Sequence, residues 1–444
     1  MNFAHRPDKF ARYYAAEKYL ENLENIAGSY QRTNIKAHPN PQMFLERMQD
    51  FLDMIGNPEK RFTYIHITGT AGKGTVASWV HAELVRAGKR AGLFTSPFVT
   101  SSIEKIQVGN ELIDPFVFAD IVDELKPHVD RALMEGRHGM PSYFELSLAV
   151  ALRYFVRMKC EYVVLEVGLG GSYDATNIIS RPLVTAITNI DLDHMAVLGP
   201  RLEDIARDKS GIIKKDSVFF TTEERPALLK IFKEKCSRVG ADHHALPVKG
   251  LDIGERNRSL TASICRSLGI INAPDRLGSA PKLPARFEII ARKPLVIMDG
   301  AHNPSKITST VRNLIALKRA AKFGRTFALI AISSDKKWKE MLAELLPHLR
   351  AVCFTRFSIP GRKCVSPKDM AFEARRSGFK GRVTVRTDPR IGFHEALKNA
   401  SARDAVLVTG SFYLAGDIRA LYCPEDQILE KRTTRAAAVT KSSK

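Results

Sequence analysis

The sequence has no apolar run long enough to cross a membrane and no apolar leader at its start. A helix that spans a bilayer needs ~20 consecutive apolar residues, and no stretch of the 444 residues approaches that length. The first residues, MNFAHRPDKFARYY, also lack the apolar segment and the small-residue cleavage site of a secretory signal. We therefore expect a cytoplasmic protein without membrane contact.

Cysteines are few and scattered, and none lies in a C-x-x-C pair. The six are Cys160, Cys236, Cys265, Cys353, Cys364 and Cys423. Several have apolar neighbours, as in VCF around Cys353. These features favour reduced and partly buried thiols over a disulfide or zinc framework.

Acidic residues are few relative to basic ones. The 68 Lys and Arg against 48 Asp and Glu give a formal net charge of +20, which favours anionic partners. We interpret the excess as spread along the chain, with only the tail, KRTTRAAAVTKSSK, forming a basic segment. No helix-turn-helix, RNP or zinc-finger signature is present in the sequence. A generally basic proteome is therefore favoured over nucleic-acid binding.

The chain is long for a single hydrophobic core, which predicts two domains. The first 60 residues are expected to be helical. From residue 62, strand and helix patterns alternate, as in a parallel sheet with helices on both faces. A break rich in Pro, Gly and Ser at 272–284 precedes a second alternating set. In such sheets, ligands bind at the carboxyl ends of the strands.

A glycine-rich phosphate loop follows the strand predicted over 62–68. It reads Gly69-Thr70-Ala71-Gly72-Lys73-Gly74-Thr75 and leads into an amphipathic helix. Glycines let backbone N–H groups approach phosphate oxygens, and the helix N-terminus adds positive potential. Lys73 is expected to reach the β- and γ-phosphates, and the Thr75 hydroxyl to bind Mg²⁺. The pattern thus favours an ATP site over an ordinary glycine turn.

Glu166 ends the apolar strand YVVLEV, directly before a glycine-rich turn. A carboxylate at that point can accept Mg²⁺ beside Thr75, although a purely structural carboxylate is the alternative.

The alternating strand and helix patterns give the predicted fold class, which is α/β. It comprises an N-terminal ATPase-type domain with a phosphate loop and a parallel sheet over 1–283, a smaller Rossmann-like α/β domain over 284–423, and a basic tail expected to be disordered over 424–444.

Further motifs follow the loop in a fixed order. They are Thr95-Ser96-Pro97, Glu104-Lys105-Ile106, Tyr143-Phe144-Glu145, LEVGLGG at 165–171, DATN at 174–177, Asp193-His194, RDKSGII at 207–213, LPARFE at 283–288 and DGAHNP at 299–304. With the glycine between lysine and threonine in GKGT, they resemble the folylpolyglutamate and dihydrofolate synthase family of the Mur ligase superfamily. The resemblance covers residues 40 to 420, approximately.

The resemblance implies a second metal site. His194 would bind a second Mg²⁺, and Lys209 would be carbamylated to give an extra carboxylate for that metal. From the residues alone, a lone histidine is more often a satisfied polar group, and Lys209 reads as a solvated surface lysine. The implied catalytic set is Lys73, Glu166, His194 and Lys209.

The resemblance also implies nucleotide contacts from the second domain. Arg286 would contact the phosphates, because its guanidinium is planar and permanently charged. Asp299 and His302 would contact ribose and phosphate, with a plain N-cap-type turn as the alternative for Asp299. Asp335 and Ser411 would edge the cleft that receives the amino acid.

The implied reaction has two steps. ATP would phosphorylate a substrate carboxylate, and the amine of L-glutamate would then attack the acyl phosphate and expel phosphate. Lys73, Arg286 and Mg²⁺ would offset the charge on the transferred group. The acid would be a folate or dihydropteroate, and the enzyme is expected to be a monomer.

Departures from the family pattern concern the substrate. Phe98 stands where the family has histidine after TSP. Because this loop lies near the folate site in relatives, the substrate cleft would include Ser96, Pro97 and Phe98. Gly254–Asn257 matches the family's HQ-x-x-N motif only loosely, and Leu260 is interpreted as standing where a nucleotide-contacting asparagine is expected. The loss of that amide would cost about 1–3 kcal/mol.

Three alternatives remain open. One is a divergent Mur-type ligase for a carboxylate other than folate, which the change at Phe98 allows. Another is a basic nucleic-acid-associated ATPase, which would explain the net charge but leaves His194, Lys209 and the DGAHNP box without a purpose. The third is an inactive ligase kept as a binding module, which the intact Lys73 and Glu166 disfavour.

Overall fold

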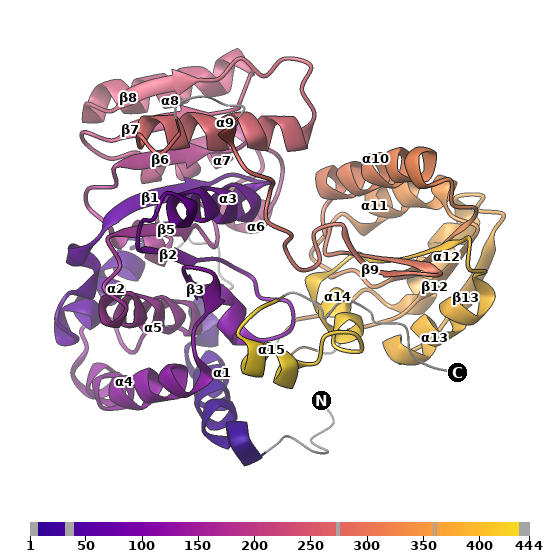
Figure 1. Cartoon of the computed structure of the whole chain (residues 1–444), viewed down its shortest axis with the longest axis horizontal. Helices are drawn as coiled ribbons and strands as arrows, with labels where there is room; N and C mark the ends of the chain where they lie inside the picture. Colours follow the sequence, from indigo (N-terminus) through magenta and orange to yellow (C-terminus); the bar gives the residue numbers. More distant parts are fainter. Residues whose placement is uncertain (1–7, 32–39, 272–275, 358, 360–361, 435–444) are drawn as a thin grey trace. The chain divides into compact units, whose positions relative to one another are not determined.

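The computed structural model describes residues 8–31, 40–271, 276–357, 359 and 362–434. The chain divides into two compact units (Figure 1). The first comprises Met1–Phe98 and Ser102–Pro281, and the second comprises Val99–Ser101 and Lys282–Lys444. Three residues between two segments of the first unit thus belong to the second. No helix of the described residues is long and apolar enough to cross a membrane.

An eight-stranded sheet forms the centre of the first unit, in the order β4-β3-β2-β5-β1-β6-β7-β8. Strand β3 pairs antiparallel with β2 and β4, and all other neighbours are parallel. The strands are β1 (Thr63–Thr68), β2 (Ala91–Phe94), β3 (Ile106–Val108), β4 (Glu111–Leu112), β5 (Tyr162–Glu166), β6 (Val184–Ile187), β7 (Val218–Thr221) and β8 (Asp242–Ala245). Central strands such as β5 (YVVLE) are continuous apolar runs, because helices cover both faces of the sheet.

Helices α3 and α9 share one core with β1, β2 and β6, and α7 and α8 pack against the other face of β6 and β7. Capping boxes begin α5 at Ser142 and α9 at Asp252, which fixes where each helix starts. The helices of this unit are α1 (Ala11–Gln31), α2 (Met43–Met54), α3 (Lys73–Arg86), α4 (Pro115–Glu135), α5 (Tyr143–Arg157), α6 (Met195–Leu198), α7 (Leu202–Lys209), α8 (Pro226–Val239) and α9 (Ile253–Ser267).

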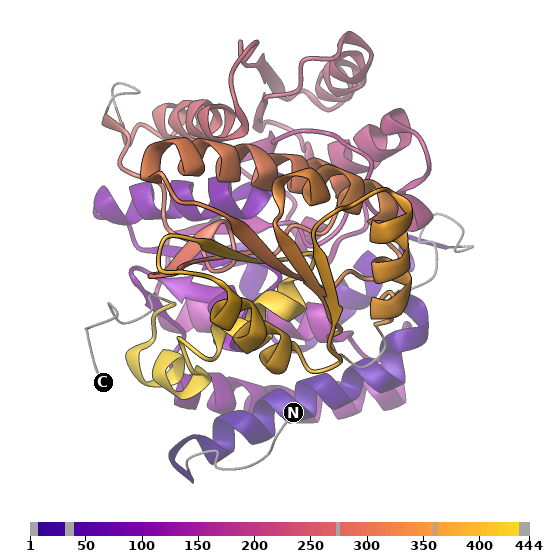
Figure 2. The ribbon, with the colours of Figure 1, turned by 90° about the vertical axis from the view of Figure 1, so that its right-hand side faces the viewer.

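The second unit is built on a six-stranded sheet in the order β13-β12-β11-β14-β10-β9. Only β9 runs antiparallel to its neighbour. The strands are β9 (Glu288–Arg292), β10 (Leu295–Asp299), β11 (Thr326–Ile330), β12 (Ala351–Phe354), β13 (Arg382–Val385) and β14 (Ala405–Thr409). Figure 2 shows this sheet between its helices.

Helices lie on both faces of the second sheet, so two apolar cores form. Helices α10, α11 and α12 contribute to one core, and α13 and α14 to the other. The helices are α10 (Pro304–Ala321), α11 (Trp338–Leu345), α12 (Pro367–Arg376), α13 (Pro389–Asn399), α14 (Phe412–Arg419) and α15 (Glu425–Lys431).

The α/β architecture predicted from the sequence is confirmed. The expectation of a disordered tail from residue 424 is wrong for its first part, because Glu425–Lys431 form α15 and bury Ile428 and Leu429. These two apolar side chains explain why a segment with five charged or amide side chains still folds against the unit. Residues 435–444 of the predicted tail lie outside the described residues.

Candidate active site

The phosphate loop connects β1 to α3, and its backbone requires glycine at two positions. Gly69 has φ 144° and Gly72 has φ 84°, values that side-chain-bearing residues rarely adopt. A Cβ at Gly69 would collide with the Thr188 side chain, and one at Gly72 would collide with Asn257. The loop therefore approaches two neighbouring segments too closely for any side chain.

The segment that follows the neighbouring strand β6 holds the loop in place. The Asn189 carbonyl accepts from the Thr70 N–H at 2.9 Å, and Asn189 Oδ1 accepts from the Ala71 N–H at 2.9 Å. Thr188 Oγ1 donates to the Ala71 carbonyl at 2.6 Å. The Thr70 hydroxyl is also committed, to the backbone of Asp191. Thr70 thus positions the loop, and its N–H is not available to phosphate.

The first turn of α3 offers the remaining donors. Helical geometry leaves the N–H groups at the start of a helix without a partner inside the helix, and the Gly74 and Thr75 N–H groups belong to that turn. Lys73 Nζ donates to the Gly69 carbonyl at 3.0 Å, so its ammonium lies at the loop. Incoming phosphate oxygens would compete with that carbonyl for the ammonium. This cradle fits a nucleotide phosphate.

Glu166 lies against the same turn. It ends β5, adjacent to β1, and is 3% exposed. Its Oε2 accepts from the Ser96 N–H at 3.1 Å, and a Cβ at Gly74 would lie 3.1 Å from the same oxygen. The structure therefore brings Glu166, Ser96 and the phosphate loop together at the carboxyl ends of neighbouring strands.

The donors around the loop suit Mg²⁺ bound together with a nucleotide. No three His, Cys, Asp or Glu side chains of the described ranges are grouped closely enough to hold a metal by themselves. Mg²⁺ in nucleotide sites commonly takes one or two carboxylates, and substrate phosphates and water complete the shell. Glu166 with the Thr75 hydroxyl is such a partial set, so metal and nucleotide would bind as a unit.

The two candidates for a second metal are Lys209, which ends α7, and His194, which directly precedes α6. A Cβ at Gly171 would lie 2.8 Å from the Lys209 backbone, so the glycine-rich turn after β5 abuts the end of α7. Lys209 is 4% exposed, which excludes the solvated surface lysine considered from the sequence. His194 has φ 51°, is one-third exposed, and places Nε2 3.8 Å from Asp193 Oδ1.

The amide beside the loop comes from Asn257. Leu260 is fully buried in the core shared by α3 and α9, whereas Asn257 is 8% exposed and its Oδ1 lies where a Cβ on Gly72 would point. The expectation that Leu260 takes the place of this asparagine is therefore wrong. The capping box at Asp252 fixes the helix start, and that signal places Asn257 one turn before Leu260 on the same face.

Phe98 takes part in a cluster that sequence reasoning missed. Lys105 is buried, and its Nζ lies 5.1 Å from the centroid of the Phe98 ring and 4.0 Å from that of Tyr143. The same Nζ donates to the Tyr143 hydroxyl at 2.8 Å. Lys105 thus supplies a cation beside Phe98, and two aromatic faces stabilise it.

Within the second unit, Asp299 ends β10 and is half-buried. Its Oδ2 accepts from the Thr310 hydroxyl at 3.0 Å and its Oδ1 from the Ala301 N–H at 3.0 Å. Burial raises the pKa of Asp299 to about 6, although the Thr310 hydrogen bond and the charge of Arg286 act in the opposite direction. The N-cap of α10 is Asn303, so Asp299 is not a helix cap.

The Phe412 ring packs against two of the side chains predicted to contact the nucleotide. The Arg286 guanidinium lies 4.0 Å from the centroid of the Phe412 ring, and the His302 ring meets it edge-on at 5.5 Å. His302 also contacts Lys306, with Nε2 2.9 Å from the ammonium. The structure therefore brings Arg286 and His302 together around an aromatic ring that the sequence did not single out.

Ser411 and Asp335 have local roles in the structure. The Ser411 hydroxyl caps α14 by accepting from the Tyr413 N–H at 3.0 Å. Asp335 lies beyond the end of β11, with its half-exposed carboxylate 3.5 Å from Lys336. The predicted contact of both residues with the incoming amino acid stays a prediction.

Two family models match successive parts of the chain. The family model described as "Mur ligase middle domain" matches residues 67–260, and the model described as "Mur ligase, glutamate ligase domain" matches residues 285–412. A curated relative, dihydrofolate synthase/folylpolyglutamate synthase of Bacillus subtilis, is 30% identical over 417 residues, which are 84% of this chain and 94% of the relative.

Solved structures are similar over most of the chain. Folylpolyglutamate synthase of Mycobacterium tuberculosis, complexed with ADP and AMPPCP, has a TM-score of 0.76 at 25% identity and covers 85% of this chain and 95% of its own. A bifunctional folylpolyglutamate synthase/dihydrofolate synthase with Mn, AMPPNP and L-glutamate bound has a TM-score of 0.72 at 25% identity. That alignment covers 85% of this chain and 93% of the solved one.

The phosphate loop, the adjacent carboxylate and the second α/β unit define an ATP-dependent, ADP-forming amide ligase of the Mur type. Within that class, the chain belongs to the folylpolyglutamate synthase and dihydrofolate synthase family. The resemblance inferred from the motifs is confirmed.

Proposed function

We propose that this chain adds L-glutamate to the carboxylate of a folate or of dihydropteroate, with ATP as the activating substrate. The observation that carries the proposal is the buried Glu166 carboxylate against the first turn of α3, in a chain 30% identical to the Bacillus subtilis enzyme over 94% of that enzyme's length. ATP would transfer its terminal phosphoryl group to the acid. The glutamate amine would then attack the acyl phosphate and release phosphate.

The phosphate loop would hold the nucleotide for this transfer. The N–H groups at the start of α3 would bind phosphate oxygens, and Lys73 would exchange the Gly69 carbonyl for the β- and γ-phosphates. Mg²⁺, held by Thr75 and Glu166, would neutralise charge on the transferred group. Because the N–H groups at the start of α3 are fixed by the fold before the substrate arrives, they would stabilise the transition state without reorganising.

His194 and Lys209 are proposed to hold a second metal ion. A buried lysine beside a metal is unfavourable as an ammonium, whereas a carbamate on its Nζ is an anionic oxygen ligand. The burial of Lys209 supports this modification, because the carbamate would be shielded from bulk water. The solved relative with Mn bound is consistent with a divalent metal requirement in this family.

The second unit would bind the other part of the nucleotide. Arg286, held over the Phe412 ring, would pair with phosphate oxygens, and His302 would add a further contact. An ionised Asp299 could accept from a ribose hydroxyl. The aromatic ring limits the motion of both side chains, so less entropy would be lost on binding.

Lys105, Phe98 and Tyr143 would form part of the folate site. A pterin or benzoate ring can stack on Phe98, and the Lys105 ammonium can pair with a carboxylate. This cluster would replace the histidine that the family has after Thr95-Ser96-Pro97. A non-folate acid remains the alternative, because the cluster differs from the family pattern. The cytoplasmic location also stays a prediction.

The test is release of ADP by the purified protein with Mg²⁺, ATP and L-glutamate, with dihydropteroate or tetrahydrofolate added in separate reactions. ADP release that requires one of these acids together with glutamate would support the proposal and identify the acceptor. Lys73→Ala is the matched control, since it should abolish turnover. Nucleotide binding sensitive to Lys73→Ala, without turnover on either acid, would refute the folate assignment and leave the ligase class intact.

A further inference from the structure

The positive charge of the chain is concentrated in the second unit. Residues 282–444 contain 32 Lys and Arg against 14 Asp and Glu, a net charge of +18, whereas residues 1–281 contain 36 against 34, a net charge of +2. The expectation that the excess is spread along the chain was wrong. The proposed phosphate contact of this unit, Arg286, accounts for one of these cations, so the charge calls for a separate explanation.

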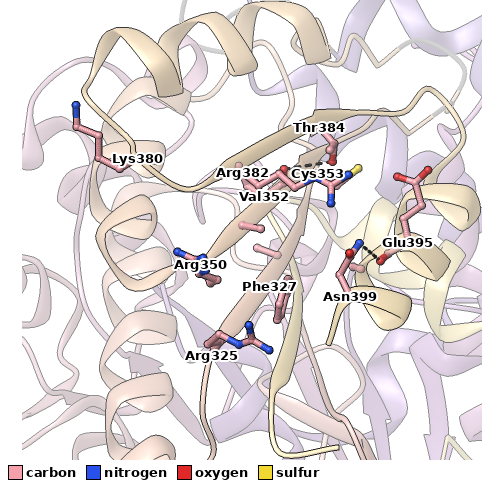
Figure 3. A pocket seen from close by; sticks show the side chains of 13 residues that line it. Arg325, Phe327, Arg350, Val352, Cys353, Lys380, Arg382, Thr384, Glu395 and Asn399 are labelled. Carbon is pink, nitrogen blue, oxygen red and sulfur yellow. Dashed lines mark hydrogen bonds between the residues drawn. The ribbon is translucent and has the colours of Figure 1, made fainter. Parts of the chain in front are cut away.

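Several of these cations surround a hollow in the second sheet. The hollow has a volume of about 300 Å³ and lies where β11, β12 and β13 begin, beside α13 (Figure 3). Its floor is apolar and includes the buried side chains of Phe327, Cys353 and Ala396. Its border carries four cations: Arg325, Arg350, Lys380 and Arg382.

Three of these cations lack a counterion among the residues that the structure describes. Arg325 pairs with Asp404 at 3.0 Å, and the nearby Glu395 is already paired with Arg386 at 2.7 Å. Arg350, Lys380 and Arg382 form no ion pair with any described residue. Like charges around one concave surface repel each other, and an anion placed between them relieves that repulsion.

A second hollow extends the same surface. It has a volume of about 480 Å³ and is lined by the ends of α11 and α12 and the turns that follow them. It shares Arg350 and Lys380 with the first hollow, so these two cations lie between both. A ligand with several anionic groups could therefore contact Arg382 in one hollow and Arg350 and Lys380 at the border of the other.

The hollow is separate from the proposed nucleotide contacts of its unit. Asp299 ends β10 and Ser411 follows β14, at the carboxyl edge of the sheet. Arg325 precedes β11, Arg350 precedes β12 and Arg382 begins β13, at the amino edge. A strand of four or five residues is about 13–17 Å long at ~3.3 Å per residue. A ligand here would therefore not occupy the nucleotide position.

We propose that this hollow binds a small organic polyanion, whose phosphate or carboxylate groups pair with Arg350, Lys380 and Arg382 and whose apolar part rests on Phe327. Guanidinium groups suit both kinds of anion, because they donate two parallel hydrogen bonds. A concave site with an apolar floor fits a compact ligand, whereas a nucleic-acid backbone is bound by extended basic surfaces. The site is additional to the proposed ligase function and does not depend on it.

The test compares two double variants of the full chain, both in a Lys73→Ala background that weakens phosphate binding at the loop. Arg350→Gln/Arg382→Gln changes the hollow. Arg312→Gln/Lys368→Gln removes the same charge from exposed positions of the same unit outside it. Equilibrium dialysis would measure binding of inorganic tripolyphosphate and of tri-γ-glutamate. Thermal unfolding would check that both variants fold alike, as expected for exposed side chains.

We expect at least one probe to bind about tenfold more weakly to the hollow variant and less than about twofold more weakly to the control. The probe that responds identifies phosphate or carboxylate as the recognised group. Equal weakening in both variants, or no binding of either probe, would overturn the proposal. So would a single-stranded oligonucleotide whose binding alone depends on Arg350 and Arg382, because the surface would then serve nucleic acid.

Discussion

The Glu166 carboxylate lies so close to Gly74 that a methyl group at residue 74 would sit 3.1 Å from Oε2. The carboxylate that ends β5 and the first turn of α3 are therefore in direct contact. This contact couples the proposed Mg²⁺ ligand to the phosphate loop. An added methyl group should therefore have different effects at two glycines of the loop, Gly74 and Gly72.

Gly74→Ala should preserve folding and impair nucleotide use. Its φ is not in the left-handed region, and alanine favours a helix over glycine by about 1 kcal/mol. The added methyl group should nevertheless displace Glu166, and we expect an about tenfold rise in the KM for Mg-ATP. Gly72→Ala is the comparison, because its left-handed backbone should cost about 1–2 kcal/mol in stability. Urea unfolding of both variants, with ADP-release kinetics, distinguishes the two effects.

Glu166→Gln should leave the fold intact and remove most activity. The amide keeps the size of the side chain and an oxygen for the Ser96 N–H, but it loses the negative charge. We expect kcat/KM to fall by roughly 10²–10³-fold and the Mg²⁺ concentration for half-maximal rate to rise. A variant with unchanged Mg²⁺ dependence would show that Glu166 is a structural carboxylate.

Arg47→Met should destabilise the first unit strongly. Arg47 and Glu145 are both 5% exposed and form paired hydrogen bonds of 2.9 and 3.0 Å. Glu145 also accepts from the Ser142 N–H in the capping box of α5. Removal of one partner from a buried ion pair costs about 3–5 kcal/mol, which urea unfolding would measure. The exposed pair Arg131–Glu135 is the control, and Arg131→Met should change stability little.

Affinity for ATP should depend on the ionisation of Asp299. Burial raises the pKa of Asp299 to about 6, so the carboxylate is ionised above that pH and takes up a proton as the pH falls through it. Protonation would remove the acceptor proposed for ribose. The KM for ATP should therefore rise about tenfold from pH 7 to pH 5. Steady-state kinetics of Asp299→Asn should show a raised KM without this step.

The same titration predicts a stability difference. The folded-state pKa of Asp299 is raised above its ordinary value of about 4, so ionised Asp299 costs stability. That cost is absent below pH 4, approximately, and fully present above about pH 6. The unfolding free energy of Asp299→Asn should therefore increase relative to that of the natural protein as the pH rises from about 4 to about 6. A constant difference from pH 4 to 7 would contradict the assignment.

Lys105→Met should affect the acid substrate and spare the nucleotide. Methionine fills similar space between Phe98 and Tyr143 but carries no charge. We expect the KM for the folate or dihydropteroate to rise about tenfold and the KM for ATP to stay unchanged. A rise in both values would indicate that Lys105 supports the fold of this region rather than the substrate site.

The sequence predicted the site best where chemistry and local backbone coincide. Gly69, Gly72 and Lys73 could be placed, because a strand, a glycine-rich turn and a helix follow one another along the chain. Glu166 could be placed, because an apolar strand ends at it. The same reasoning gave the two α/β domains, since alternating strand and helix patterns depend only on near neighbours.

Contacts between segments that are far apart in the sequence were not predicted. The cluster of Phe98, Lys105 and Tyr143 forms only when α5 meets the loop after β2, and the burial of Lys209 depends on the glycine turn after β5. Asn257 was missed through an error of three residues, nearly one helical turn, which shifts a side chain by about 4.5 Å along the axis. The helix at Glu425–Lys431 was missed because its charged residues obscured two buried apolar ones.

The three residues Val99–Ser101 have a consequence for how this protein can be divided. They belong to the second unit, where Val99 packs against Ala285, Phe412 and Ala415 and Thr100 accepts from the buried Arg419 at 3.1 Å. The chain therefore passes between the units at three points, after residues 98, 101 and 281. No single proteolytic cut or gene truncation can separate the two units intact, and complementation by two co-expressed fragments would leave residues 99–101 on the wrong fragment.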